Sequence, residues 1–151
     1  VKTYFHDCEY DAVPAELATS SGLDRLYLNG NNLTDIGDMT GVLWKDGAKV
    51  RVHNNSLTFE DLEGNVALSS DATVAEFRYS PQAEVGTETY LYPDAGSMVT
   101  LESGVGGSAN VYTWIKGTED VVSETATVTI DAFDAAANSG KYFAVVQNIG
   151  K

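Results

Sequence analysis

Residues 23–36, Leu-Asp-Arg-Leu-Tyr-Leu-Asn-Gly-Asn-Asn-Leu-Thr-Asp-Ile, decide the fold of this chain. Leu26 and Leu28 alternate with other residues, which predicts a short strand whose leucines point into a core. Asn31 follows at a turn, where its side chain can bond exposed backbone groups. Leu33 and Ile36 then cover the core from the segment that returns to the next strand. Because one such unit cannot bury its apolar face alone, the pattern predicts neighbouring copies.

Two copies flank this stretch, at spacings of 23 and 24 residues. Downstream, residues 50–57 read Val-Arg-Val-His-Asn-Asn-Ser-Leu, and Asn55 follows Asn31 by 24 residues. Upstream, residues 3–14 read Thr-Tyr-Phe-His-Asp-Cys-Glu-Tyr-Asp-Ala-Val-Pro, with Cys8 at the asparagine position. Single alternations of this kind occur in many strands, whereas three in register indicate a repeat.

The three stretches together resemble the leucine-rich repeat, which has leucines at these positions and asparagine or cysteine at the turn. The resemblance implies that Cys8, Asn31 and Asn55 hold structural positions in successive turns. We therefore expect Cys8 to be a buried, inert thiol rather than a nucleophile.

A second resemblance appears where the repeats end. Residues 55–62, Asn-Ser-Leu-Thr-Phe-Glu-Asp-Leu, and residues 79–86, Tyr-Ser-Pro-Gln-Ala-Glu-Val-Gly, resemble a junction in surface proteins of Bacteroidetes bacteria. There a repeat array stops and an immunoglobulin-like domain begins. The resemblance implies a leucine-rich-repeat segment with a C-terminal cap and linker strand over residues 1–84, and an immunoglobulin-like β-sandwich over residues 85–151.

The residues near this junction predict local structure on their own. Thr58 and Asp61 have the spacing of a capping box at a helix N-terminus. Residues 74–79 alternate, and we place them as an edge strand against the last repeat. Four apolar residues are expected to close the core from the returning side: Met39, Val42, Leu43 and Trp44.

The second half of the chain changes to short alternating segments between glycine-rich turns, the pattern of a β-sandwich. The expected strands are residues 98–101, 111–115, 126–130 and 142–146. We expect Trp114 at the centre of this core. Residues 138–144, Asn-Ser-Gly-Lys-Tyr-Phe-Ala, resemble the tyrosine corner of immunoglobulin domains, which implies a structural role for Tyr142. Both cysteine positions of that family hold other residues, Ser103 and Ala144. The predicted fold class is mixed and mainly β.

The sandwich lacks a clear last strand. Only Asn-Ile-Gly-Lys follows Gln147, whereas a strand of ordinary length has about 5–6 residues. Three explanations stay open: a shortened chain, a sandwich that does without the strand, or an edge that a strand-donating neighbour fills.

Composition limits the classes of partner that this chain can bind. The chain has a net charge of −13, with 22 Asp and Glu against 9 Lys and Arg, which argues against nucleic acid as a partner. No apolar run reaches the ~20 residues that span a bilayer, and no basic-then-apolar leader precedes Val1, so we expect no membrane insertion of this chain. These features suit a protein of the cell surface or the extracellular space.

No catalytic constellation is evident. His6 and His53 both lie in repeat strands, away from any serine in a strained turn. The glycine-rich residues 103–107 precede a strand rather than a helix and are typical of a turn. Asp131, Asp134 and Asn138 could be calcium ligands, but their spacing suits an ordinary connection between strands equally well. We therefore expect no enzyme activity, no cofactor and no metal site.

One surface stands out from this background, and we call it the column face: the outward positions of the three repeat strands. The register predicts three columns across these strands: Lys2, Arg25 and Lys49; Tyr4, Tyr27 and Arg51; His6, Asn29 and His53. These basic and aromatic residues are either a ligand surface or ordinary polar residues facing solvent. On the first interpretation, Arg25 and Arg51 face solvent and contact the ligand.

Two functions follow as expectations. The first is a non-enzymatic binding or adhesion module that recognises a protein or glycan on the column face, with the sandwich as a spacer. The alternative is a structural subunit of an extracellular assembly, or a virion decoration protein, joined through strand pairing at the open sandwich edge.

Overall fold

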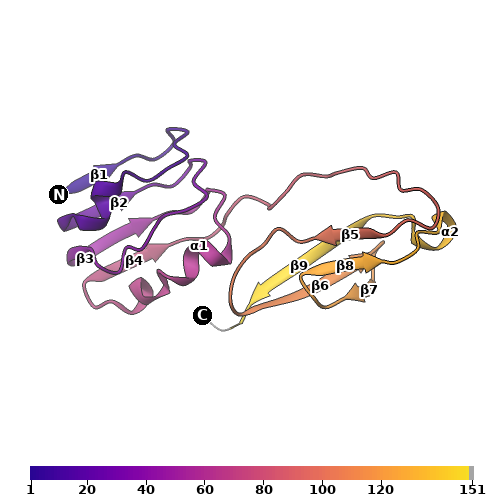
Figure 1. The fold of residues 1–151 in the computed structure, drawn as a ribbon. Helices are drawn as coiled ribbons and strands as arrows, with labels where there is room; N and C mark the ends of the chain where they lie inside the picture. Colours follow the sequence, from indigo (N-terminus) through magenta and orange to yellow (C-terminus); the bar gives the residue numbers. More distant parts are fainter. Residues whose placement is uncertain (150–151) are drawn as a thin grey trace. The chain divides into compact units, whose positions relative to one another are not determined.

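The computed structural model describes residues 1–149 and is mainly β, with 34% of residues in strands and 13% in helices. The chain divides into two compact units, Val1–Val85 and the residues from Gly86 onward (Figure 1). Each unit has its own sheets, so each is described by itself.

The first unit is built on one four-stranded parallel sheet in the order β1-β2-β3-β4. Its strands are β1 (Lys2–Tyr4), β2 (Ser21–Tyr27), β3 (Leu43–Arg51) and β4 (Val74–Arg78). The segments that return between them contain the 3-10 helices η1 (Ala15–Thr19) and η2 (Val66–Ser70) and the helix α1 (Phe59–Glu63). The predicted edge strand against the last repeat is confirmed as β4.

The core of this unit lies between the sheet and the return segments. Leu26, Leu28 and Val50 are fully buried, as the alternation predicted. Met39, Val42 and Trp44 are buried too, but Leu43 is 68% exposed, so its predicted place in the core is wrong. The cause is that Leu43 starts strand β3 and points away from Trp44, its buried neighbour.

A ladder of side-chain amides joins the turns that follow the strands. The amide oxygen of Asn31 accepts from the Cys8 N–H at 3.0 Å, and that of Asn55 accepts from the Leu33 N–H at 3.1 Å. Gln82 continues the series, because its amide oxygen accepts from the Asn55 N–H at 3.0 Å. Each of these three amide side chains bonds backbone groups of a turn that would otherwise lack hydrogen-bond partners.

Cys8 holds the predicted turn position, and its thiol donates to the carbonyl oxygen of His6 at 3.1 Å. It is exposed rather than buried, so that part of the prediction is wrong. The turn of Cys8 follows β1, the outermost strand of the sheet, whereas the turns of Asn31 and Asn55 lie further inside the array.

The predicted capping box is confirmed at the start of α1. The Asp61 carboxylate accepts from the Thr58 N–H at 2.7 Å and from its hydroxyl at 3.0 Å. This bonding fixes the first turn of the helix, and Leu62 is buried against the core.

The second unit consists of two antiparallel sheets. Strands β5 (Val99–Glu102) and β8 (Thr127–Ile130) form one, and β7 (Asp120–Ser123), β6 (Asn110–Lys116) and β9 (Tyr142–Asn148) form the other in the order β7-β6-β9. The short helix α2 (Ala135–Asn138) precedes β9. The four strands predicted here are present within one or two residues of their expected bounds, and β7 is an additional one.

Trp114 and Tyr142 lie as predicted in this unit. Trp114 is 5% exposed, and its indole N–H donates to the carbonyl oxygen of Thr125 at 3.1 Å. The Tyr142 hydroxyl donates to the carbonyl oxygen of Asn138 at 2.8 Å, which ties β9 to the preceding helix. Asp134 and Asn138 are used in that helix: Asp134 accepts from the N–H groups of Ala136 and Ala137.

Candidate binding face

The sheet of the first unit brings the column face together in the predicted order. Lys2 lies beside Arg25 and Arg25 beside Lys49, while Tyr4 lies beside Tyr27 and Tyr27 beside Arg51. In the third column the backbones continue side by side, because Asp7 N–H donates to the Asn29 oxygen at 3.0 Å and Gly30 N–H to the His53 oxygen at 3.1 Å. His6, Asn29 and His53 thus follow the three strand ends in order.

β4 adds a fourth member to two of these columns. Glu76 lies beside Lys49, and Arg78 beside Arg51. Sequence reasoning identified the strand but not these two side chains as part of the column face. Their alternation within residues 74–79 was the signal that could have found them, because it sets which residues share a face with Lys49 and Arg51.

An aromatic and cationic row crosses the sheet along the second column. The Tyr4 and Tyr27 rings meet edge to face with centroids 5.2 Å apart. On the next strand, the Arg51 guanidinium lies 4.5 Å from the centroid of the Tyr27 ring. Such contacts hold the Tyr27 ring and the guanidinium in fixed orientations, so the surface is ordered before any ligand arrives.

Glu76 fixes the other side of this guanidinium. Arg51 Nε and Nη2 lie 2.7 and 3.2 Å from the two Glu76 carboxylate oxygens, and Lys49 Nζ lies 3.4 Å away. Hydrogen bonding from Arg51 holds the pKa of Glu76 below its usual value, and Lys49 adds to this effect. The Arg51 side chain is only 30% exposed. The expectation that Arg51 points freely into solvent is therefore wrong.

Arg25 is held as well, by its own neighbour. Its Nη1 donates to the Asp24 carboxylate and, at 2.7 Å, to the Asp24 carbonyl oxygen. A longer bond of 3.3 Å reaches the carbonyl oxygen of Gly47 on the next strand. Arg25 thus braces β2 against β3 and presents only part of its side chain to solvent, contrary to the sequence-based expectation.

The two histidines differ sharply in their surroundings. His6 is exposed and lies 2.9 Å from the Asp7 carboxylate. His53 is 7% exposed, and its Nδ1 has no hydrogen-bond partner among the described residues. Burial, followed by the charges of Arg78 and Arg51, lowers the pKa of His53. His53 therefore belongs to the interior edge of the sheet and not to the accessible column face.

The accessible part of the column face is basic and aromatic. Five of the nine Lys and Arg residues in the chain belong to the columns, namely Lys2, Arg25, Lys49, Arg51 and Arg78, and a sixth, Lys45, lies earlier on β3. Tyr4 is 51% exposed at the outer strand, and Lys2, His6 and Arg78 are exposed around the row. These four side chains are the ones that an incoming ligand can reach without breaking an internal contact of Arg25 or Arg51.

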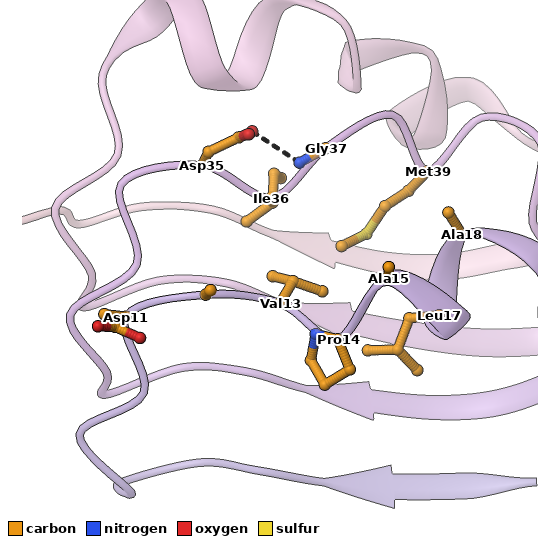
Figure 2. Close-up of a pocket in the computed structure, with 11 residues that line it drawn as sticks. Asp11, Val13, Pro14, Ala15, Leu17, Ala18, Asp35, Ile36, Gly37 and Met39 are labelled. Atoms are coloured by element: carbon orange, nitrogen blue, oxygen red, sulfur yellow. Dashed lines mark hydrogen bonds between the residues drawn. The ribbon is translucent and has the colours of Figure 1, made fainter.

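A small pocket lies between the first two return segments, residues 11–18 and 35–39 (Figure 2). It has a volume of about 200 Å³ and is lined mainly by apolar side chains, among them Val13, Leu17 and Met39. Asp35 lies at its rim, where its carboxylate accepts from the Gly37 N–H at 2.7 Å. Because this carboxylate is used within its own turn, we interpret the pocket as a gap between two return segments.

The described residues contain no cluster of three or more His, Cys, Asp or Glu that could hold a metal ion. A search of residues 1–149 for a long, apolar helix able to cross a membrane finds none. Comparison with protein-family models, with curated proteins and with solved structures found no match. Function is therefore inferred from the geometry of the column face.

Proposed function

We propose that the column face is the ligand-binding surface of a non-enzymatic recognition or adhesion module, and that its ligand is an anionic protein segment or glycan. The observation that carries this proposal is the gathering of five of nine basic residues in the columns of one sheet, in a chain with net charge −13.

The chemistry of the face suits such a ligand. A local positive region on a negative protein attracts an anionic partner and orients its approach. The exposed Tyr4 ring offers an apolar surface on which a sugar ring or an aromatic side chain can stack. Because Arg51 is already held by Glu76 and Tyr27, binding would order few side chains and so lose little conformational entropy.

The proposal includes the wider architecture and location. We assign the first unit to the leucine-rich-repeat class, supported by the parallel register and the amide ladder, and the second to an immunoglobulin-like sandwich that serves as a spacer. The support for the second assignment is the buried Trp114 between antiparallel sheets and the Tyr142 bond to Asn138. A module of this kind acts at the cell surface or outside the cell.

Charge reversal at exposed positions tests the binding face. A glycan and protein array identifies ligands of the wild-type chain, and a sulfated oligosaccharide serves as a defined anionic probe. Arg78→Glu should weaken binding of the probe about tenfold, because it replaces an accessible attractive charge by a repulsive one. Lys141→Glu makes the same charge change in the second unit and should leave affinity within about twofold.

Tyr4→Ala adds a second, uncharged test of the same face. It should weaken a glycan ligand while leaving the salt dependence of binding as in wild type, because no charge is removed. Equal affinities of wild type, Arg78→Glu and Tyr4→Ala for every array ligand would overturn the proposal. Arg51→Glu is less informative, since it would place a second carboxylate against Glu76 and destabilise the sheet.

A second candidate function is structural, as a subunit of an extracellular assembly. One observation favours it: β9 is the outer strand of its sheet, and its sequence, Tyr-Phe-Ala-Val-Val-Gln-Asn, contains no charged residue. This feature is independent of the column face.

A further inference from the structure

The outer edge of β9 is the most complete unpaired edge in the second unit. β9 pairs with β6 along seven consecutive residues without a bulge, and among the described residues no strand lies on its other side. A long, regular strand that ends a sheet offers a template for a further strand.

The register shows which backbone groups face outward. Gly117 N–H donates to the Lys141 oxygen at 2.9 Å, and Ile149 N–H donates to the Ala109 oxygen at 3.2 Å. These bonds mark the odd-numbered residues of β9 as the ones bonded to β6, because bonded and non-bonded pairs alternate in an antiparallel ladder. The backbone N–H and C=O groups of Tyr142, Ala144 and Val146 therefore point to the open edge.

This edge has none of the usual protections against pairing. Residues 142–148 contain no lysine, no other charge and no proline, and the register has no bulge that would twist the strand away. Edges that stay solvated in soluble proteins generally carry at least one of these features. The edge of β9 is thus suited to accept a strand.

The core beneath this edge is also incomplete. Among the described residues of the second unit, only Trp114 and Val128 are buried hydrophobic side chains. Tyr142, Ala144 and Val146 point toward the same interior but are only half-buried. A strand added beside β9 would bring alternate side chains over these three residues and remove their apolar surface from water.

A matching strand donor lies in the same chain. Residues 87–92, Thr-Glu-Thr-Tyr-Leu-Tyr, are rich in types that favour strands, yet they form no strand and make no backbone–backbone hydrogen bond within the described chain. Within the segment, the Thr89 hydroxyl donates to the Thr87 carbonyl oxygen at 3.3 Å. Tyr90, Leu91 and Tyr92 are 71%, 54% and 90% exposed. Glu88 makes a long ion pair of 3.8 Å with Lys141, and both side chains are exposed. Removing these residues from their place breaks little else.

We propose that residues 87–92 of one copy add as a strand to the outer edge of β9 in a second copy of this chain. This gives the structural candidate function its contact site and its partner, and it does not depend on ligand binding at the column face. The donor is tethered but movable, because the nearest bonded backbone on either side is that of Ala83, which bonds to Asn55, and that of Asp94, whose carbonyl oxygen accepts from Ser97. Reciprocal exchange closes a dimer, and one-way exchange builds a chain of copies.

Two blocking variants test the exchange. Val146→Pro removes an outward N–H from the acceptor edge without removing a bond to β6, since proline is tolerated where the N–H faces away from the sheet. Tyr90→Pro combined with Leu91→Pro blocks the donor. Successive backbone N–H groups of a strand point to opposite edges, so two consecutive prolines remove an N–H from whichever edge would face β9. Glu88→Gln is the matched control, as it removes only the ion pair with Lys141.

Sedimentation velocity of the full chain over a concentration series gives the readout. Wild type and Glu88→Gln should associate with rising concentration, and more strongly with added salt, which screens the repulsion between chains of net charge −13. Each blocked variant alone should stay monomeric. Mixing the two should form a one-to-one dimer, because one supplies an intact donor and the other an intact acceptor.

A peptide of residues 86–93 provides an independent measurement. It should bind the donor-blocked protein and protect the amides of Ala144 and Val146 from hydrogen exchange, whereas a scrambled peptide should not. If circular dichroism shows that Val146→Pro has lost its fold, Ala144→Pro replaces it as the acceptor block. A wild-type chain that is monomeric at every concentration and salt, or blocked variants that associate as wild type does, would overturn the proposal. Sulfated-oligosaccharide binding should be unchanged in all of them.

Discussion

At the scale of single residues, burial decides what a position in a column can do. His6 and His53 occupy equivalent places just after β1 and β3, but only His6 is exposed. His53 is shielded from water and lies near Arg51 and Arg78, both of which disfavour its charged form. One column thus contains an accessible polar side chain and one that water does not reach.

The burial of His53 predicts a pH dependence of stability. Its pKa in the folded chain lies below the ordinary value of 6.5, so between the two values the unfolded chain binds a proton that the folded chain does not. The free energy of unfolding should therefore fall as the pH drops below 6.5 toward the folded pKa. Above pH 6.5, His53 should have no effect on the pH dependence. Urea denaturation at pH 7.5 and 5.5 measures this difference.

His53→Gln should flatten the pH dependence in this range, whereas His6→Gln should retain the wild-type slope. The effect of Glu76 is separate, because its pKa is lowered from 4.5 and its contribution is lost only in more acidic solution. A wild-type slope in His53→Gln would contradict this account of the buried imidazole.

Residue types also explain which parts of the site could be read from sequence. The columns were predictable, because strand periodicity and a spacing of 23 and 24 residues fix which side chains share a row. The ion pairs were not, since Asp24 and Glu76 hold Arg25 and Arg51 through rotamers that no pattern specifies. Gln82 was missed because it replaces the expected asparagine with a longer side chain after an irregular segment.

At the scale of elements, sequence periodicity predicted most strands and little of their edges. The four strands expected in the second unit are present, because each alternates and is bounded by turn residues. β7 was missed, since Asp120–Ser123 is a short, exposed strand whose pairing depends on β6 rather than on its own pattern. Leu43 was misplaced because a strand beginning cannot be distinguished from a return segment by apolar residues alone.

Trp114 lies buried on β6 and donates to Thr125 in the segment between β7 and β8, which predicts an effect confined to the second unit. Trp114→Ala should destabilise it by about 3–5 kcal/mol, because a large buried side chain leaves a cavity. The substitution leaves Trp44, in the first unit, as the remaining tryptophan, so its fluorescence should report unchanged unfolding there. Calorimetry should show the loss of the transition that belongs to the second unit.

Val121→Ala is the control, since Val121 is exposed on β7 and its loss should shift stability little. A Trp114→Ala chain that keeps both transitions would show that Trp114 is not the centre of the second core. Loss of both transitions together would show that the two units unfold as one.

At the scale of the whole molecule, residues 84–93 are the part of the chain with the fewest constraints. They form no strand or helix, and their backbone makes no hydrogen bond to the rest of the described chain. The sheets on either side are bonded throughout. Local opening should therefore concentrate in this connection.

Limited proteolysis tests that expectation with two enzymes. Chymotrypsin should cut after Tyr90 and Leu91 and release two stable fragments, because both residues are exposed in unbonded backbone. Trypsin should leave the connection intact, since no Lys or Arg lies between Arg78 and Lys116, and both of those residues belong to paired strands. Mass spectrometry identifies the fragments. Cleavage by trypsin at Arg78 at the chymotryptic rate would show that β4 opens as readily as the connection.

The amide ladder has a consequence for how such a chain can grow. The amide oxygens of Asn31 and Asn55 each accept from backbone N–H groups of the turn before, so a duplicated block of 24 residues between them would meet the same kind of partner. Beyond Asn55 the next rung is Gln82, whose amide nitrogen donates to the Val52 carbonyl oxygen at 3.0 Å, as that of Asn55 donates to the Leu28 oxygen. The first unit ends soon after this glutamine, at Val85. Internal duplication could lengthen the sheet strand by strand, while the glutamine keeps a fixed exit whatever its length.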